Sequence, residues 1–237
     1  MEGQLTLLEH LEELRRRIIK SSIFVFIASI FVYVNAEALI NVITRPVGRL
    51  VFIAPHEAFT SYIKVSLFGG VIVSSPYILY QVWGFISSGL KKHEKRHIYI
   101  FAPLSFILFV LGAVFGFMII VPIGIKFLLG FSSDYLAPMI TIGRYISFVA
   151  VLTLLFGVIF ELPVVSMFLG RIGVLKPDQM ISKRRYGTLF IFIAAAMFTP
   201  PDVVTQCLLA VPLLVLYEIS ILLVKMVYRP KNGAYKY

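Results

Sequence analysis

Charged residues and cysteine are both scarce in this chain. Only 14% of its 237 residues are Asp, Glu, Lys or Arg, whereas 59% are hydrophobic. The single cysteine, Cys207, lies inside an apolar run, so the sequence has neither a disulfide framework nor a cysteine-rich metal site. A water-soluble core of this size does not need so much apolar surface, and long apolar runs are typical of transmembrane helices. The composition therefore predicts an all-α, polytopic membrane protein.

The pattern of a cleavable signal peptide is also missing. The first seventeen residues, MEGQLTLLEHLEELRRR, are polar and include four glutamates. A signal peptide would place its basic residues first and its apolar core soon after them. We therefore expect residues 1–17 to form a cytoplasmic helix, and the first span to stay in the mature protein.

Six apolar runs are candidates for membrane spans. They cover residues 18–34, 65–86, 98–125, 145–169, 186–198 and 203–224. The fifth run would be only about 20 Å long as a helix, and the sixth meets Glu218 before it ends. We therefore expect the last two helices to be short and to thin the bilayer locally.

The basic residues predict how these spans are oriented. Of the 22 Lys and Arg residues, 17 fall in the first twenty residues, in the segments 87–97 and 170–185, or in the tail. By the positive-inside rule these parts are cytoplasmic, which places both termini inside and requires six crossings. The chain then forms one transmembrane domain over 1–237, with an external cap at 35–64 and a disordered tail at 226–237.

Glu161 lies well inside the fourth apolar run, two residues before Pro163. An acid at the centre of a span costs about 2.5–3.5 kcal/mol on insertion scales, so it needs a cavity or a partner. It could be a proton site or a contact point for something entering the membrane. It could also be a protonated glutamate that bonds to a neighbouring helix. Pro163 should kink the span.

Two more polar residues, Asp202 and Gln206, flank the start of the sixth run. Asp202 follows a Pro-Pro turn, where an aspartate often caps the next helix. A functional role is the alternative. On the cytoplasmic side, Glu13 can pair with Arg17 four residues later, and Glu94 can moderate the basic residues around it. Alternatively, Glu13 and Glu94 converge to form a site for a pair of guanidinium groups, because arginine forks match carboxylates.

The stretch HEKRH at residues 93–97 matches the H-E-x-x-H zinc-protease pattern. Four cationic side chains within residues 91–97 would repel Zn²⁺, and the sequence offers no third ligand. His10 is the only other cytoplasmic histidine in the predicted topology. We therefore expect no metal, no cofactor and no catalytic residue here.

Four blocks in order carry a resemblance to a known family. They read HLEELRRR, SSPYILYQVWGFISSGLKKHEKR, SFVAVLTLLFGVIFELPV and FTPPDVVTQCLLAVPLLVLYEI. Together they resemble TatC, the multi-spanning receptor subunit of the twin-arginine protein translocase, from about His10 to about Lys225.

The resemblance implies a receptor for Arg-Arg signal peptides of folded cargo, located in a bacterial-type cytoplasmic (inner) membrane. The signal-binding acids of the family fall on Glu94 and Glu13, with Glu12 a less favoured substitute. Arg15 and Phe85 match positions linked to signal-peptide recognition. Transport would be driven by the proton-motive force, without bond chemistry.

The resemblance also implies contacts with small single-span partners, TatA and TatB. Glu161 matches the intramembrane glutamate near which they dock, and Asp202 and Gln206 fall where TatB-like contacts are placed. Pro46 matches a proline of the outer cap. The alternative function is a proton-coupled small-solute carrier that uses Glu161, although the chain has no inverted repeat to support it.

Overall fold

The computed structural model describes residues 7–48, 50–90, 95, 98–130, 138–198 and 202–228. Within these residues the chain is helical apart from its turns and connections, and its isolated β-bridge pairs Val51 with Thr141 in parallel. The prediction of an all-α membrane protein is confirmed. Five helical stretches of the described chain are long and apolar enough to cross a membrane: Leu8–Val34, Pro55–Ser88, Ile98–Leu129, Ile142–Arg171 and Val203–Val227.

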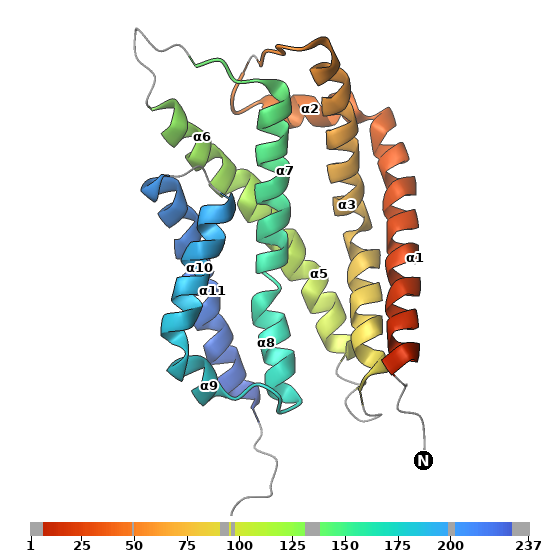
Figure 1. Cartoon of the computed structure of the whole chain (residues 1–237), viewed down its shortest axis with the longest axis vertical. Helices are drawn as coiled ribbons and strands as arrows, with labels where there is room; N and C mark the ends of the chain where they lie inside the picture. Colours follow the sequence, from red (N-terminus) through yellow and green to blue (C-terminus); the bar gives the residue numbers. More distant parts are fainter. Residues whose placement is uncertain are drawn as a thin grey trace, which may run out of the picture.

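The first two spans lie side by side (Figure 1). Helix α1 (Leu7–Val34) is continuous, so the expected cytoplasmic helix and the first span are one element. Helix α2 (Ala36–Thr44) follows at the end of the bundle. Helix α3 (Pro55–Ser88) starts with proline in its first turn, where the missing N–H costs nothing. The irregular part of the cap therefore ends at Ala54, earlier than residue 64.

The third span is continuous but irregular. Helix α5 (Ile98–Phe115) passes into a π-helical turn, η1 (Gly116–Ile120), and then into α6 (Val121–Leu129). This span crosses the bundle diagonally (Figure 1). Gly112 lies so close to α7 (Ile142–Ile159) that an added Cβ would collide with the carbonyl oxygen of Phe156. The GAVFG run thus serves helix packing within the chain.

The fourth span is broken in its middle. Helix α7 ends at Ile159, and α8 (Leu162–Arg171) starts with Pro163 in its first turn. Phe160 and Glu161 form the turn between them. The kink expected from Pro163 is confirmed, and it places Glu161 where the backbone leaves the regular helix. Helix α7 is central to the largest buried cluster, to which it contributes Ile146, Val149 and Phe156.

The last two spans form a hairpin. After the short helix α9 (Pro177–Ser182), helix α10 (Arg184–Phe198) packs against α11 (Val203–Val227). Helix α10 has 15 residues, or about 22 Å, which is less than the hydrocarbon core of about 30 Å. The far ends of α10 and α11 lie below those of α7 and α3 (Figure 1). Helix α11 extends to Val227, and most of the predicted disordered tail lies outside the described residues.

The two described ends of the chain, at the start of α1 and the end of α11, lie at the same end of the bundle (Figure 1). The opposite end carries the cap. There the Tyr145 hydroxyl donates to the carbonyl oxygen of Ile43 over 2.8 Å. Glu57 accepts from the backbone N–H groups of Ile53 and Gly143, at 3.0 and 3.1 Å. One carboxylate therefore ties the cap loop to the start of α7.

Candidate functional site

The end of the bundle that holds the start of α1 carries a partly buried ion pair. Arg17 donates from Nε and Nη2 to Oε1 of Glu13, over 3.0 and 2.6 Å. Its Nη1 donates to Oε1 of Gln81 on α3, at 2.9 Å. Gln81 in turn donates from Nε2 to the Tyr77 hydroxyl, at 2.7 Å. Glu13 thus lies at the junction of α1 and α3, and its side chain is only 14% exposed.

Phe85 lies beside this ion pair, on the last turns of α3. Its ring stacks on that of His10 with a centroid distance of 4.3 Å and an interplanar angle of 25°. The Ser88 hydroxyl is 3.4 Å from Nδ1 of His10 and donates to the carbonyl oxygen of Phe85. The structure therefore brings Glu13, His10 and Phe85 together at one end of α1 and α3. The His10 contact was not predicted from the sequence.

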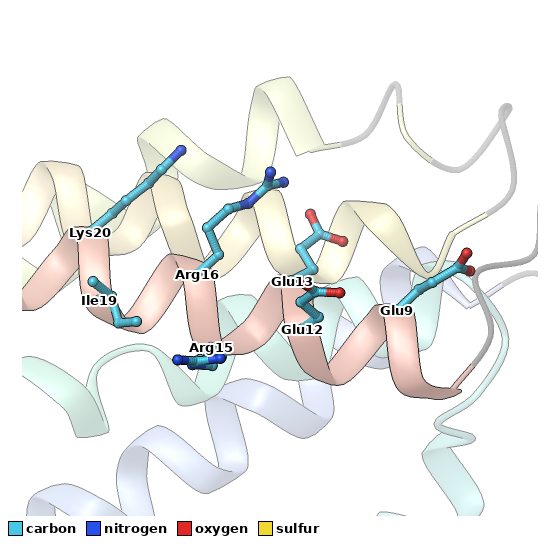
Figure 2. A pocket seen from close by; sticks show the side chains of 7 residues that line it. All are labelled: Glu9, Glu12, Glu13, Arg15, Arg16, Ile19 and Lys20. Atoms are coloured by element: carbon cyan, nitrogen blue, oxygen red, sulfur yellow. The ribbon is translucent and has the colours of Figure 1, made fainter.

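Arg15 lies on the other side of α1. Figure 2 shows its side chain pointing away from those of Glu13 and Arg16. An open hollow of 680 Å³ along this end of α1 is lined by Glu9, Glu12, Glu13, Arg15, Arg16, Ile19 and Lys20. The hollow mixes acids near the helix start with bases further along, as the order of charges in LEHLEELRRR dictates.

Glu94, the second predicted acid, lies outside the described residues, as do the two histidines of HEKRH. Lys95 is described and lines a second hollow of 450 Å³ between α1, α3 and α5. Arg17, Tyr80, Trp83 and Tyr99 also line this second hollow, which places it directly beside the Glu13–Arg17 pair.

Glu161 anchors a polar chain in the middle of the bundle. The Ser105 hydroxyl on α5 donates to Oε2 of Glu161, and Trp83 on α3 donates from Nε1 to Ser105 over 2.8 Å. The other carboxyl oxygen, Oε1, is buried without a hydrogen-bond partner among the described residues. Glu161 is therefore hydrogen-bonded to a neighbouring helix and also keeps one acceptor for a further donor.

The aromatic rings around the hydrogen bonds that join Trp83, Ser105 and Glu161 form a small buried cluster. Trp83 packs edge-on against Phe168 at 5.0 Å and stacks on Phe101 at 5.9 Å. Neither Trp83 nor Ser105 was predicted from the sequence as part of a site. Trp83 is the only tryptophan of the chain, and that rarity was the one available signal.

Asp202 and Gln206 both have structural partners. Asp202 caps α11 by accepting from the Thr205 backbone N–H at 2.7 Å and from the Thr205 hydroxyl. These bonds, led by the hydroxyl, hold the pKa of Asp202 below its usual value. Gln206 donates from Nε2 to the Phe192 carbonyl oxygen over 3.0 Å, which ties α11 to α10. The capping interpretation of Asp202 is confirmed.

Pro46 lies in the exposed turn that follows α2, in the cap. Glu57 helps to fix the cap to the bundle through its bonds to Ile53 and Gly143. Glu57 was not predicted from the sequence, because one of its backbone partners, Gly143, lies 86 positions away at the start of α7.

Fold and site together define a multi-pass, all-helical membrane protein. Its described residues include a carboxylate–guanidinium pair at one end and the carboxyl group of Glu161 within the bundle. Residues 9–212 match the family model described as Sec-independent protein translocase protein (TatC). The chain belongs to this family, so it is a component of a protein translocase.

Individual relatives agree along nearly the whole chain. The chain is 44% identical over 233 residues to the Sec-independent protein translocase protein TatC of Carboxydothermus hydrogenoformans, covering 96% of each chain. It is 42% identical over 241 residues to the TatC of Aquifex aeolicus, covering 97% of this chain and 99% of that one. A crystal structure described as the twin arginine translocase receptor TatC matches with a TM-score of 0.85 and 41% identity, over 93% of this chain and 100% of that chain.

Proposed function

We propose that this chain is the receptor subunit that binds the twin-arginine signal peptides of folded cargo, with Glu13 and Glu94 as the acids that hold the arginines. The observation that carries the proposal is the bonding of Glu13. Its carboxylate already accepts two N–H groups of a guanidinium, at 2.6 and 3.0 Å, in a partly buried position. A carboxylate placed in this way suits an arginine ligand better than a lysine ligand, because only arginine offers a fork of donors.

Phe85 and Arg15 are the supporting groups in this proposal. The Phe85–His10 stack places an apolar surface beside Glu13, against which the apolar stretch of a signal peptide can lie. Arg15 lines the hollow beside α1 and faces away from Glu13. It therefore acts on a different part of the signal peptide from the arginine pair.

We propose that this end of the bundle, with both termini, lies in the cytoplasm of a bacterial-type cell. The distribution of Lys and Arg supports that orientation, because 17 of 22 fall on one side. The same-end position of the described chain ends agrees with it (Figure 1). Helix α10, although short, then makes the fifth of the six crossings, where the bilayer is thinned.

Glu161, with Asp202 and Gln206, is the proposed docking region for single-span partners of the TatA and TatB kind. The Oε1 atom of Glu161 has no hydrogen-bond partner among the described residues, and this supports the role, because a buried acceptor without a donor costs free energy until one is supplied. Transport itself is proposed to use the proton-motive force. Membership of a protein translocase family supports this function over the alternative of a small-solute carrier.

The test is binding of a labelled Arg-Arg signal peptide to the full chain in lipid nanodiscs. We expect Glu13→Gln and Glu94→Gln each to weaken binding about tenfold or more, because each removes a charge-assisted bond. Replacing Arg-Arg by Lys-Lys should also weaken binding to the unaltered chain. Glu218→Gln is the matched control, since Glu218 pairs with Arg184 at the same end of the bundle but outside the site. Unchanged binding in both site variants would refute the assignment.

A further inference from the structure

The carboxylate of Glu13 already holds a guanidinium that belongs to the chain itself. Arg17 donates two N–H groups to Oε1 of Glu13 and a third to Gln81. A cargo arginine recognised by Glu13 would use the same class of bond at the same carboxylate. We infer that Arg17 is a built-in competitor, which occupies Glu13 in the free receptor and must be displaced by the signal peptide. This inference rests on the proposed function of Glu13.

The Glu13–Arg17 pair differs from an ordinary surface ion pair four residues apart on a helix. Both side chains are largely covered, at 14% and 23% exposure, and Arg17 reaches across to another helix. The side-chain amide of Gln81 accepts from Arg17 through its oxygen and donates to the Tyr77 hydroxyl through its nitrogen, and this second bond orients the amide oxygen toward Arg17. Gln81 and Tyr77 therefore form a binding site on α3 for the competing guanidinium.

Gly84 is part of this binding site for the Arg17 guanidinium. An added Cβ at position 84 would collide with Nη1 of Arg17, and its neighbouring guanidinium atoms are also within contact distance. The atoms it would meet are the flexible end of Arg17 rather than backbone. The lack of a side chain at position 84 is therefore what lets Arg17 lie between Glu13 and Gln81.

The guanidinium of Arg17, once displaced from Glu13, can enter a neighbouring hollow. The hollow of 450 Å³ beside the ion pair is lined by Arg17 itself together with Tyr80, Trp83 and Tyr99. Aromatic faces attract guanidinium groups. Arg17 can therefore turn from Glu13 toward the exposed rings of Tyr80 and Tyr99 by rotating its own side chain, without movement of α1 or α3.

Competition of this kind lowers apparent affinity by the fraction of free receptors in which Glu13 is open. That fraction is a property of the receptor alone, so it affects every cationic ligand by the same factor. Because the competition by Arg17 lowers every apparent affinity, Arg- or Lys-containing segments that bind weakly stay largely unbound. Discrimination between Arg-Arg and Lys-Lys remains a property of the carboxylates.

The experiment measures the dissociation constants of an Arg-Arg signal peptide and its Lys-Lys counterpart on the full chain in nanodiscs. Arg17→Gln removes the competitor, and Gly84→Ala displaces it while keeping its charge. We expect both variants to bind both peptides about fivefold more tightly, with an unchanged ratio between the peptides. Arg184→Gln is the matched control, because it removes an Arg–Glu pair of 2.7 Å at the same end of the bundle, and it should leave both constants unchanged.

Weaker or unchanged binding in Arg17→Gln would overturn the inference and make Arg17 a positioning or structural residue. Tightening in Arg17→Gln but not in Gly84→Ala would also overturn it, because the effect would then be a general loss of positive charge. In the double variant Glu13→Gln/Arg17→Gln, binding should equal that of Glu13→Gln alone. If Glu13→Gln itself leaves binding intact, the proposed signal site fails. If it abolishes binding while Arg17→Gln gives no tightening, only the competitor fails.

Discussion

Two glutamates of this chain occupy opposite kinds of environment. Glu13, at the end of the bundle, accepts from a guanidinium that is itself bonded to Gln81. Glu161, within the bundle, accepts from the neutral hydroxyl of Ser105 and buries its second oxygen without a described partner. Among the described residues, the first carboxylate accepts from a positively charged guanidinium, whereas the second accepts from a neutral hydroxyl.

This difference separates recognition of a charge from recognition of a hydrogen-bond donor. A carboxylate close to water can exchange one cation for another at modest cost, because both states are paired and partly solvated. A carboxyl group among apolar side chains gains far more from a single added donor, since the alternative is an unsatisfied buried atom. We therefore expect ionic ligands at Glu13 and polar helix partners at Glu161.

The largest stability effect should come from Ser105→Ala. The Ser105 hydroxyl is the acceptor for Trp83 and the donor to Glu161, so its removal orphans two buried groups at once. At about 1–3 kcal/mol for each of the two unsatisfied groups, the loss should reach roughly 2–6 kcal/mol. Unfolding in detergent micelles measures it. Ser182→Ala is the control, because that hydroxyl is exposed and bonds only locally to Gln179. Equal stability of the two variants would refute the buried polar chain.

A smaller effect should separate the two glutamates directly. In Glu161→Gln, the amide oxygen still accepts from Ser105, so the free energy of unfolding should stay within about 1 kcal/mol of the starting chain. In Glu13→Gln, Arg17 loses its carboxylate and the chain should lose about 1 kcal/mol, reduced by partial exposure. Added salt should narrow the Glu13 difference and leave the Glu161 difference alone. A salt-sensitive Glu161 variant would contradict the comparison.

The spans were predictable from the sequence because lipid imposes a simple requirement on composition and length. Apolar runs long enough to cross the membrane were visible, and the break before Pro163 followed from the missing N–H of proline. The short α10 was also visible as a run of 13 apolar residues between Arg185 and Thr199. The predicted helix starts were less accurate, because the polar first turns of a helix, such as those of α3, lie outside the apolar run that marks the span.

The partners of the site residues were harder to predict, because they depend on which helix faces meet. The Glu13–Arg17 pair was visible as a spacing of four, whereas Gln81 is 64 positions from Arg17. Ser105 lies 56 positions from Glu161, in a run where a single serine carries no signal. Local spacing is fixed by helix geometry, but contacts between helices require the packing itself.

The smallest effect concerns the turn before α11, which is a carboxylate site of a third kind. Asp202 caps the helix through Thr205, whose hydroxyl and backbone N–H lower the pKa of the carboxyl group below its ordinary value of 3.8. A lowered pKa in the folded state means that the charged form stabilises the cap above the ordinary pKa. This contribution is lost as the pH falls through the lower, folded value.

Hydrogen exchange of the Thr205 amide, corrected for its intrinsic rate, should therefore show weaker protection at about pH 3 than at about pH 6. Asp202→Asn keeps a side-chain oxygen for the cap without a titrating group, so its protection should not change between these conditions. An equal loss in both chains would mean that acid loosens the α10–α11 hairpin elsewhere, and that the cap charge plays no part in holding the start of α11.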